Sequence, residues 1–168
     1  MKSKTVYCVQ WKNCGKNTSV KFYKFDLKPN PIVIHSYANF TGVIGVNVTQ
    51  NFTDQIVVKV KVYRLIKIIK LVKIPIPIGE YSEFDLCEVF NSNKAVICPY
   101  FDKINVECKC PLKPGNYNIE KIDFMINEVK IPPALKWVSK GNYEVIMEMY
   151  HNNTQILCLQ VNTALSFK

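Results

Sequence analysis

The stretch Cys108-Lys-Cys-Pro-Leu-Lys-Pro-Gly-Asn-Tyr117 closes a dense block of cysteines that begins at Cys87 and includes Cys98. Such a block is either a set of disulfides in a secreted protein or a metal site in a cytosolic one. Cys108 and Cys110 are separated by a single residue, which is closer than the usual spacing of zinc knuckles. The spacing therefore disfavours a metal site, although it does not fix how the cysteines pair.

Five glycosylation sequons favour a secretory route and therefore disulfides. The sequons begin at Asn17, Asn39, Asn47, Asn51 and Asn152. Chance in a chain of this composition gives roughly one sequon, so coincidence in an Asn-rich sequence is the weaker explanation. The first ten residues contain no apolar segment typical of a secretory signal, and Met1-Lys2 is consistent with a cloning start.

Positive charge is concentrated in the first half of the chain. The net charge is +9, and residues 55–79 contain no Asp or Glu although five lysines and one arginine fall there. Such a stripe suits lipid headgroups, an acidic protein or nucleic acid, or it is a solvated strand face. Nucleic acid is disfavoured because Tyr63 is the only aromatic side chain between the basic residues at 59–73.

Alternation of apolar and polar residues predicts an antiparallel all-β domain. We expect about eight strands, within a range of seven to nine. Strands are expected at 19–27, 31–35, 41–49, 55–63, 66–73, 117–127, 142–150 and 157–167. In the last strand Leu157 and Leu159 point inward while Cys158 points outward. One helix is expected after Ser82-Glu-Phe-Asp85, which resembles a capping box. The whole chain, 1–168, reads as one domain, with 1–10 as an N-terminal extension.

Several motifs resemble the ganglioside activators of the ML lipid-recognition superfamily. These motifs, in order, are Trp11-x-x-Cys14, Leu27-x-Pro29-x-Pro31, Lys73-Ile-Pro75, Cys87, Cys98-Pro99, Cys108-x-Cys110-Pro-x-Lys113-x-Gly115-x-Tyr117, Gly141-Asn-Tyr143 and Cys158. The resemblance spans residues 11–168 and implies a β-cup with an apolar lipid cavity.

The resemblance also implies a disulfide pattern. It pairs Cys14 with Cys158, Cys87 with Cys110, and Cys98 with Cys108. A fourth family disulfide is missing, because Ile76 stands at one cysteine position and no cysteine lies near Tyr81. Cys8 lies outside the pattern and is expected to be a free thiol, with an intermolecular disulfide as the alternative.

The resemblance suggests two sets of functional residues. Candidate cavity residues are Val58, Val60, Val62, Ile122, Phe124, Ile126, Met147 and Leu159, for which ordinary core packing is the alternative. Candidate membrane-contact residues are Leu71, Val72, Leu135, Trp137 and Val138, with Lys67, Lys70 and Lys73 attracting anionic lipids. Trp137 matches a membrane-touching tryptophan of the family, although it could instead pack under its own loop. Val72 stands where the family has a second tryptophan.

The predicted function is non-enzymatic lipid binding and transfer in a secreted or lysosomal setting. The expected ligand is a glycosphingolipid, phospholipid or fatty acid, with a lysosomal glycosidase as a further partner and no metal or other cofactor. His35 and His151 are the only histidines, and no hydrolase motif accompanies them, so no catalytic residue is assigned. Asp85 and Glu88 are interpreted as helix surface. The alternative is a secreted carrier of a small hydrophobic signal, or a receptor ligand with no hydrolase partner.

Overall fold

The computed structural model describes residues 8–35, 38–53, 55–126 and 140–167, with the backbone alone at residues 34, 124, 126 and 167. Within these ranges the strands are β1 (Gln10–Asn13), β2 (Val20–Lys28), β3 (Ile32–Ile34), β4 (Ala38–Val48), β5 (Ile56–Lys67), β6 (Leu71–Ile76), β7 (Glu83–Asp85), β8 (Gly115–Ile126), β9 (Gly141–His151) and β10 (Thr154–Phe167). Two helices, α1 (Leu86–Ser92) and α2 (Lys94–Lys103), follow a short 3-10 turn, η1 (Gly79–Ser82). The expected all-β class is confirmed.

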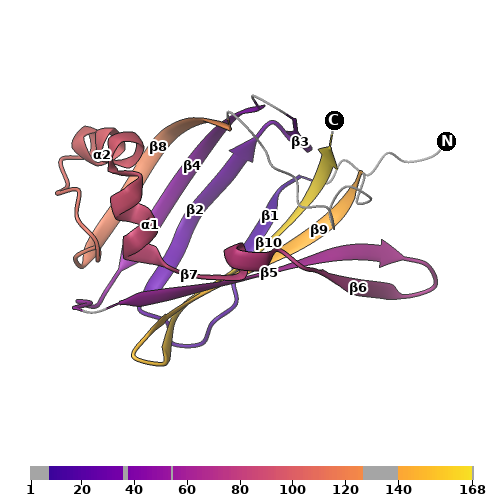
Figure 1. Cartoon of the computed structure of the whole chain (residues 1–168), viewed down its shortest axis with the longest axis horizontal. Coiled ribbons are helices and arrows are strands. Elements are labelled where there is room, and N and C mark those ends of the chain that lie inside the picture. The colour runs from indigo at the N-terminus through magenta and orange to yellow at the C-terminus, as the bar shows by residue number, and fades with distance from the viewer. Residues whose placement is uncertain (1–7, 36–37, 54, 127–139, 168) are drawn as a thin grey trace.

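The strands form two sheets (Figure 1). The larger sheet has the order β1-β10-β9-β5-β6, with β3 beside β10 and β7 beside β5, and the smaller sheet has the order β2-β4-β8. Both helices lie at one end of the molecule, and the β5–β6 hairpin extends away at the other end (Figure 1). Val20 and Val48 of the smaller sheet share a core cluster with Ile56 and Leu157 of the larger one, so the sheets pack face to face.

Successive side chains of a strand point to opposite faces, and this alternation determines which residues of the larger sheet are buried. Val58 on β5 pairs with Met149 on β9, and Met149 pairs with Leu157 on β10, so these side chains share the inward face. Cys158 lies on the outward face, as expected, and yet it is only 7% exposed. Its disulfide to Cys14 covers this position on the outer side of the sheet.

Two local expectations are wrong. The segment 66–73 is not one strand: β5 ends at Lys67, β6 begins at Leu71, and these two residues pair across the turn. The expected single helix is two helices, and the first begins later than the proposed capping box. Residues 83–85 pair with β5 instead, and the Asp85 carboxylate caps α1 by accepting a hydrogen bond from the Glu88 backbone N–H at 2.9 Å. Pairing with an existing strand outweighs a weak local helix signal.

Candidate functional site: an apolar cavity between the sheets

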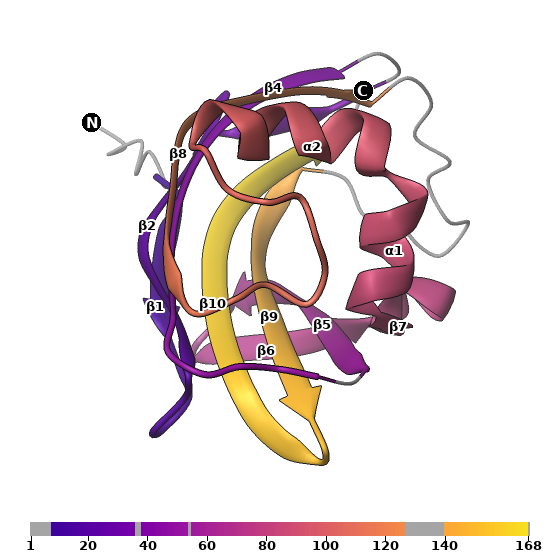
Figure 2. The same cartoon turned by 90° about the vertical axis from the view of Figure 1, so that its left-hand side faces the viewer.

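An apolar cavity of about 260 Å³ lies between the two sheets, beside the helices. It is lined by Val20, Phe22, Val46, Val48, Phe52, Ile56, Leu86, Phe90, Ile97, Phe101, Cys110, Leu112, Met149, Ile156 and Leu157. All these side chains end in carbon or sulfur, so nothing in the lining can hydrogen-bond to a polar ligand strongly. The cavity therefore suits hydrocarbon. Figure 2 looks toward the end of the fold where α1 and α2 lie beside the two sheets.

The cysteine block builds one wall of this cavity. Cys87 of α1 is bonded to Cys110, and Cys98 of α2 is bonded to Cys108, so both helices are tied to the segment that leads into β8. The implied pairing is therefore present in the structure, including Cys14–Cys158. The disulfides hold two short helices that could not keep this position by local propensity alone.

Aromatic packing continues the same wall. Phe90 and Phe101 meet edge to face at 5.6 Å between ring centroids, and Phe101 lies 6.3 Å from the ring of Tyr117. The Tyr117 hydroxyl donates to the Lys113 carbonyl at 2.6 Å, and burial raises the pKa of this tyrosine. The Lys-x-Gly-x-Tyr part of the motif thus closes a loop that places an aromatic ring in the core.

The residues predicted to line a cavity lie farther along the strands. Val58 and Leu159 are buried, Met147 packs against the core cluster, and Val60, Val62 and Ile122 are half-buried. The side chains of Phe124 and Ile126 lie outside the described part of the structure. None of the six described side chains lines the 260 Å³ cavity. On β5, β9 and β10 they occupy the same inward faces as lining residues, so contact with a longer lipid chain stays a prediction.

Sequence reasoning missed the aromatic and helical lining. One helix was expected, with Asp85 and Glu88 on its surface, but none of its apolar residues was selected for the cavity, whereas Phe90 and Phe101 are 8% and 7% exposed. The signal was available, since Leu86 and Phe90 are four residues apart, as are Ile97 and Phe101. Such pairs lie on one face of a helix.

The tip of the β5–β6 hairpin is apolar and exposed. Ile68 and Ile69 are 77% and 96% exposed, and Leu71 is 57% exposed. Among the residues that the structure describes, neither Lys67 nor Lys70 takes part in an ion pair. The tip therefore combines two large exposed side chains, which sequence reasoning did not select, with two free cations.

Lys73, in contrast, already has an acidic partner. Its Nζ lies 2.7 Å from Oε1 of Glu144, which is 3% exposed and also accepts a hydrogen bond from Gln160 at 2.7 Å. This pairing leaves less of the Lys73 charge for a membrane than expected. Leu135, Trp137 and Val138, the other predicted membrane-contact residues, lie outside the described residues.

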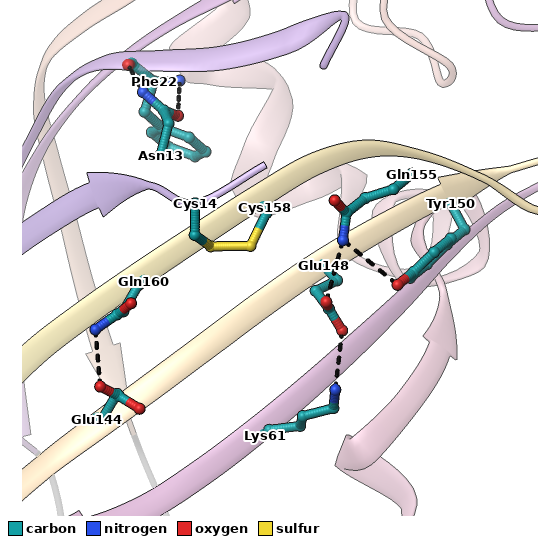
Figure 3. The surroundings of a disulfide bond; sticks show 10 residues. All are labelled: Asn13, Cys14, Phe22, Lys61, Glu144, Glu148, Tyr150, Gln155, Cys158 and Gln160. Carbon is teal, nitrogen blue, oxygen red and sulfur yellow. Dashed lines mark hydrogen bonds and ion pairs between the residues drawn. A yellow bond between two sulfur atoms is a disulfide. The ribbon is translucent and has the colours of Figure 1, made fainter. Parts of the chain in front are cut away.

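The outer face of the larger sheet carries a second ion pair (Figure 3). Lys61 lies 3.2 Å from Glu148, and the hydrogen bond between them raises the pKa of the lysine. Glu148 also accepts from Gln155 at 3.1 Å. Much of the basic stripe at 59–73 is thus neutralised across the sheet, because Lys59 also lies 3.8 Å from Glu83. Net positive charge remains at the hairpin tip.

All five sequon asparagines are exposed. Four of them lie at or near the connections between strands. Asn17 lies between β1 and β2, Asn47 near the end of β4, Asn51 between β4 and β5, and Asn152 between β9 and β10. Since Ile56 pairs with His151 at one end of β5 and Lys67 begins the hairpin turn at the other, these sites lie opposite the hairpin tip. Asn39, near the start of β4, is the exception.

In the described structure, the residues suited to catalysis or metal binding lie apart from one another. His35 is exposed near β3, whereas His151 packs on Phe52 at 5.2 Å, at the opposite end of β10. In the described part of the chain, no group of three or more His, Cys, Asp or Glu side chains is placed to hold a metal ion. Cys8 is exposed and unbonded. The described helices are too short and polar to cross a bilayer.

The sequence profile of the ML domain matches residues 8–165. The protein therefore belongs to the ML domain family, and the cavity agrees with the lipid-binding or lipid-transfer role of that family. The chain is similar to the ganglioside GM2 activator of Macaca fascicularis, with 25% identity over 92% of this chain and 82% of the relative. The mouse ganglioside GM2 activator is 24% identical over 92% and 80%. A Niemann-Pick type C2 protein from Japanese carpenter ant aligns over 95% of this chain and 99% of its own, with 16% identity and a TM-score of 0.47.

Proposed function

We propose that this protein is a non-enzymatic lipid-transfer protein. It takes a glycolipid or phospholipid from a membrane, holds the acyl chains between its sheets, and delivers the lipid to a hydrolase or another membrane. The observation that carries the proposal is the cavity of about 260 Å³ with its wholly apolar lining. Each methylene moved from water into such a site contributes about 0.8 kcal/mol.

The size of the cavity supports a hydrocarbon occupant. Small-molecule sites usually measure about 300–1,000 Å³, so this cavity is slightly smaller than that range. It suits part of an acyl chain and excludes a sugar or phosphate headgroup, whose polar atoms would find no hydrogen-bond partner there. The headgroup would thus stay outside, where a hydrolase such as a lysosomal glycosidase could reach it.

The hairpin tip supports contact with an anionic membrane surface. Ile68 and Ile69 would enter the interfacial region, and Lys67 and Lys70 would each contribute about 1 kcal/mol near anionic lipids. Glycans on four of the five sequons would lie at the other end of the fold and leave the tip free. We place the protein in a secreted or lysosomal setting, as a single unit over 1–168.

Transfer of lipid between vesicles tests this function. Fluorescent ganglioside or phosphatidylcholine in donor vesicles is expected to reach acceptor vesicles faster when the purified protein is added, at pH 5 or pH 7. If the protein moves neither lipid at either pH, the transfer function is wrong, and a carrier of a small hydrophobic signal becomes the better interpretation.

Variants of the tip belong in the same experiment. Ile68→Asp with Ile69→Asp is expected to lower vesicle binding at least tenfold, because two carboxylates would replace the side chains that enter the interface. Trp137→Ala, which changes a membrane-contact residue predicted from the sequence and not part of the tip, is expected to weaken vesicle binding without unfolding the protein. Val96→Asp is the matched control, since Val96 is 60% exposed on α2, at the other end of the molecule. Equal losses in the control and the tip variant would contradict the role of the hairpin.

A further inference from the structure

Arg64 is the only charged residue at the inward positions of β5, β6, β9 and β10 that the structure describes. The inward positions of β5 alternate from Ile56 through Val62 to Arg64, and the pairing of β5 with β9 runs from Ile56 to Leu65 without a shift. Arg64 pairs with Tyr143 on β9 and with Ile74 on β6. An arginine on the lipid-facing side of the sheet is unexpected unless an anion binds it.

The surroundings of Arg64 make room for its guanidinium group. A Cβ atom placed on Gly141 would lie 3.3 Å from Nε and 3.5 Å from Nη2 of Arg64, and 3.6 Å from the Tyr143 ring. Glycine therefore lets the guanidinium lie over the backbone at the start of β9. This gives a physical reason for the Gly141-Asn-Tyr143 motif in this chain.

No carboxylate among the described residues neutralises Arg64. Its side chain is half-buried, and it takes part in none of the ion pairs of the structure, unlike Lys61 and Lys73 on the outer face. A charge partly removed from water without a partner destabilises a fold. Burial raises the pKa of Tyr143 and the nearby arginine opposes this effect, so that tyrosine stays neutral and offers no negative charge.

Polarity on the inward face changes along the strands. From the cavity outward, successive cross-strand rows are Val58–Met149–Leu157, Val60–Met147–Leu159 and Val62–Val145–Val161, and the next row is Arg64–Tyr143–Thr163. Three apolar rows thus lead from the cavity to one polar row near the base of the hairpin. Leu165, in the next row of β10, packs against a core cluster that includes Ala38 and Phe40 of the smaller sheet, and against the cluster of Ile76 and Tyr143. The space between the sheets therefore extends as far as the Arg64 row.

We propose that Arg64 binds the anionic headgroup of a lipid whose chain lies along these apolar rows. This inference rests on the proposed lipid-binding function and names the ligand class: lipids with a sulfate, phosphate or carboxylate headgroup. Arg64 lies eight residue steps beyond Ile56 on β5, which is about 26 Å of strand at about 3.3 Å per residue. That length matches a long extended acyl chain. The planar guanidinium group can hold such an anion through two parallel hydrogen bonds.

Two lipids that differ only in charge test the inference. Sulfated galactosylceramide and galactosylceramide with the same acyl chain compete with a fluorescent ceramide for the delipidated full chain. The wild type is expected to prefer the sulfated lipid about tenfold, as one charge-assisted interaction would give. Arg64→Gln is expected to bind both lipids equally and to unfold at the same urea concentration or a higher one. If Arg64→Gln keeps the preference, the proposal is overturned.

Two controls test whether surface charge or a free-ion site accounts for the preference. Lys59→Gln removes an equal charge from the outward face of β5, at a residue with no proposed membrane contact, and is expected to keep the preference; loss of the preference there would assign it to surface charge instead of Arg64. Equimolar inorganic sulfate should also leave the preference intact, and its abolition by sulfate would mean that the site serves a free ion. If neither lipid competes with the ceramide in the wild type, lipid binding itself fails and Arg64 loses its role with it.

Discussion

Arg64 and Glu144 are charged residues on the same sheet, but they lie on opposite faces of it. Glu144 is more deeply buried, yet its carboxylate contacts Lys73 and Gln160 and is therefore satisfied. Arg64 pairs with a tyrosine across the sheet and has no acidic partner in the described structure. The difference in pairing, more than the difference in burial, makes Arg64 the residue that a ligand would complete.

Two glycine positions of β4 are expected to differ in how well the fold tolerates an added methyl group. A Cβ on Gly45 would lie 2.6 Å from the Tyr23 ring and 2.8 Å from Cβ of Lys24, whereas on Gly42 the nearest atom would be 3.5 Å away. Gly45→Ala is therefore expected to lower the free energy of unfolding by about 1–3 kcal/mol, because β2 must move. Gly42→Ala is expected to change it by less than about 0.5 kcal/mol. Urea denaturation of both variants measures this, and equal losses would contradict the close approach of β2 at Gly45.

At the scale of elements, the β5–β6 hairpin combines an edge strand with an exposed turn. β6 ends the order of the larger sheet, and Pro75 together with Lys73 on it discourages pairing with another chain. Ile76 is 5% exposed and packs with Tyr143. A side chain in the core thus anchors the base of the hairpin, while its tip extends away from the rest of the molecule (Figure 1).

The start of α1 provides a test at the same scale. The Asp85 carboxylate accepts the Glu88 backbone N–H and lies at the positive end of the helix. Asp85→Ala is expected to lower the free energy of unfolding by about 1 kcal/mol, while Asp85→Asn, which keeps the acceptor, should lose much less. Chemical denaturation distinguishes them. An equal loss in both variants would show that the charge matters and the cap does not.

At the scale of the whole molecule, the disulfides act over very different spans. Cys14–Cys158 joins the residue that follows β1 to β10 across a sequence separation of 144, whereas Cys98–Cys108 closes a separation of 10. Both connect segments that already pack together, but the longer loop restricts the unfolded chain far more.

Removing each disulfide should therefore have a graded effect. In the chain-entropy relation, replacing Cys14 and Cys158 by serine is expected to lower the free energy of unfolding by about 5 kcal/mol, against about 3 kcal/mol for Cys98 and Cys108. Urea denaturation of the two double variants checks the order. A larger loss from the short loop would indicate that the helices and the cysteine block, not chain entropy, dominate the stability.

The sequence by itself determined the all-β class, the inward faces of β5, β9 and β10 and, through the ordered cysteine motifs, the family and its three disulfides. These features are local alternation or fixed spacing, which the backbone geometry translates directly into structure. Only the tertiary structure decided where the cavity lies, because one wall depends on where the disulfides hold the two short helices relative to β8. It also decided which lysines are neutralised and that Arg64, among the residues the structure describes, has no acidic partner on the inward face, since ion pairs form between strands that are distant in the sequence.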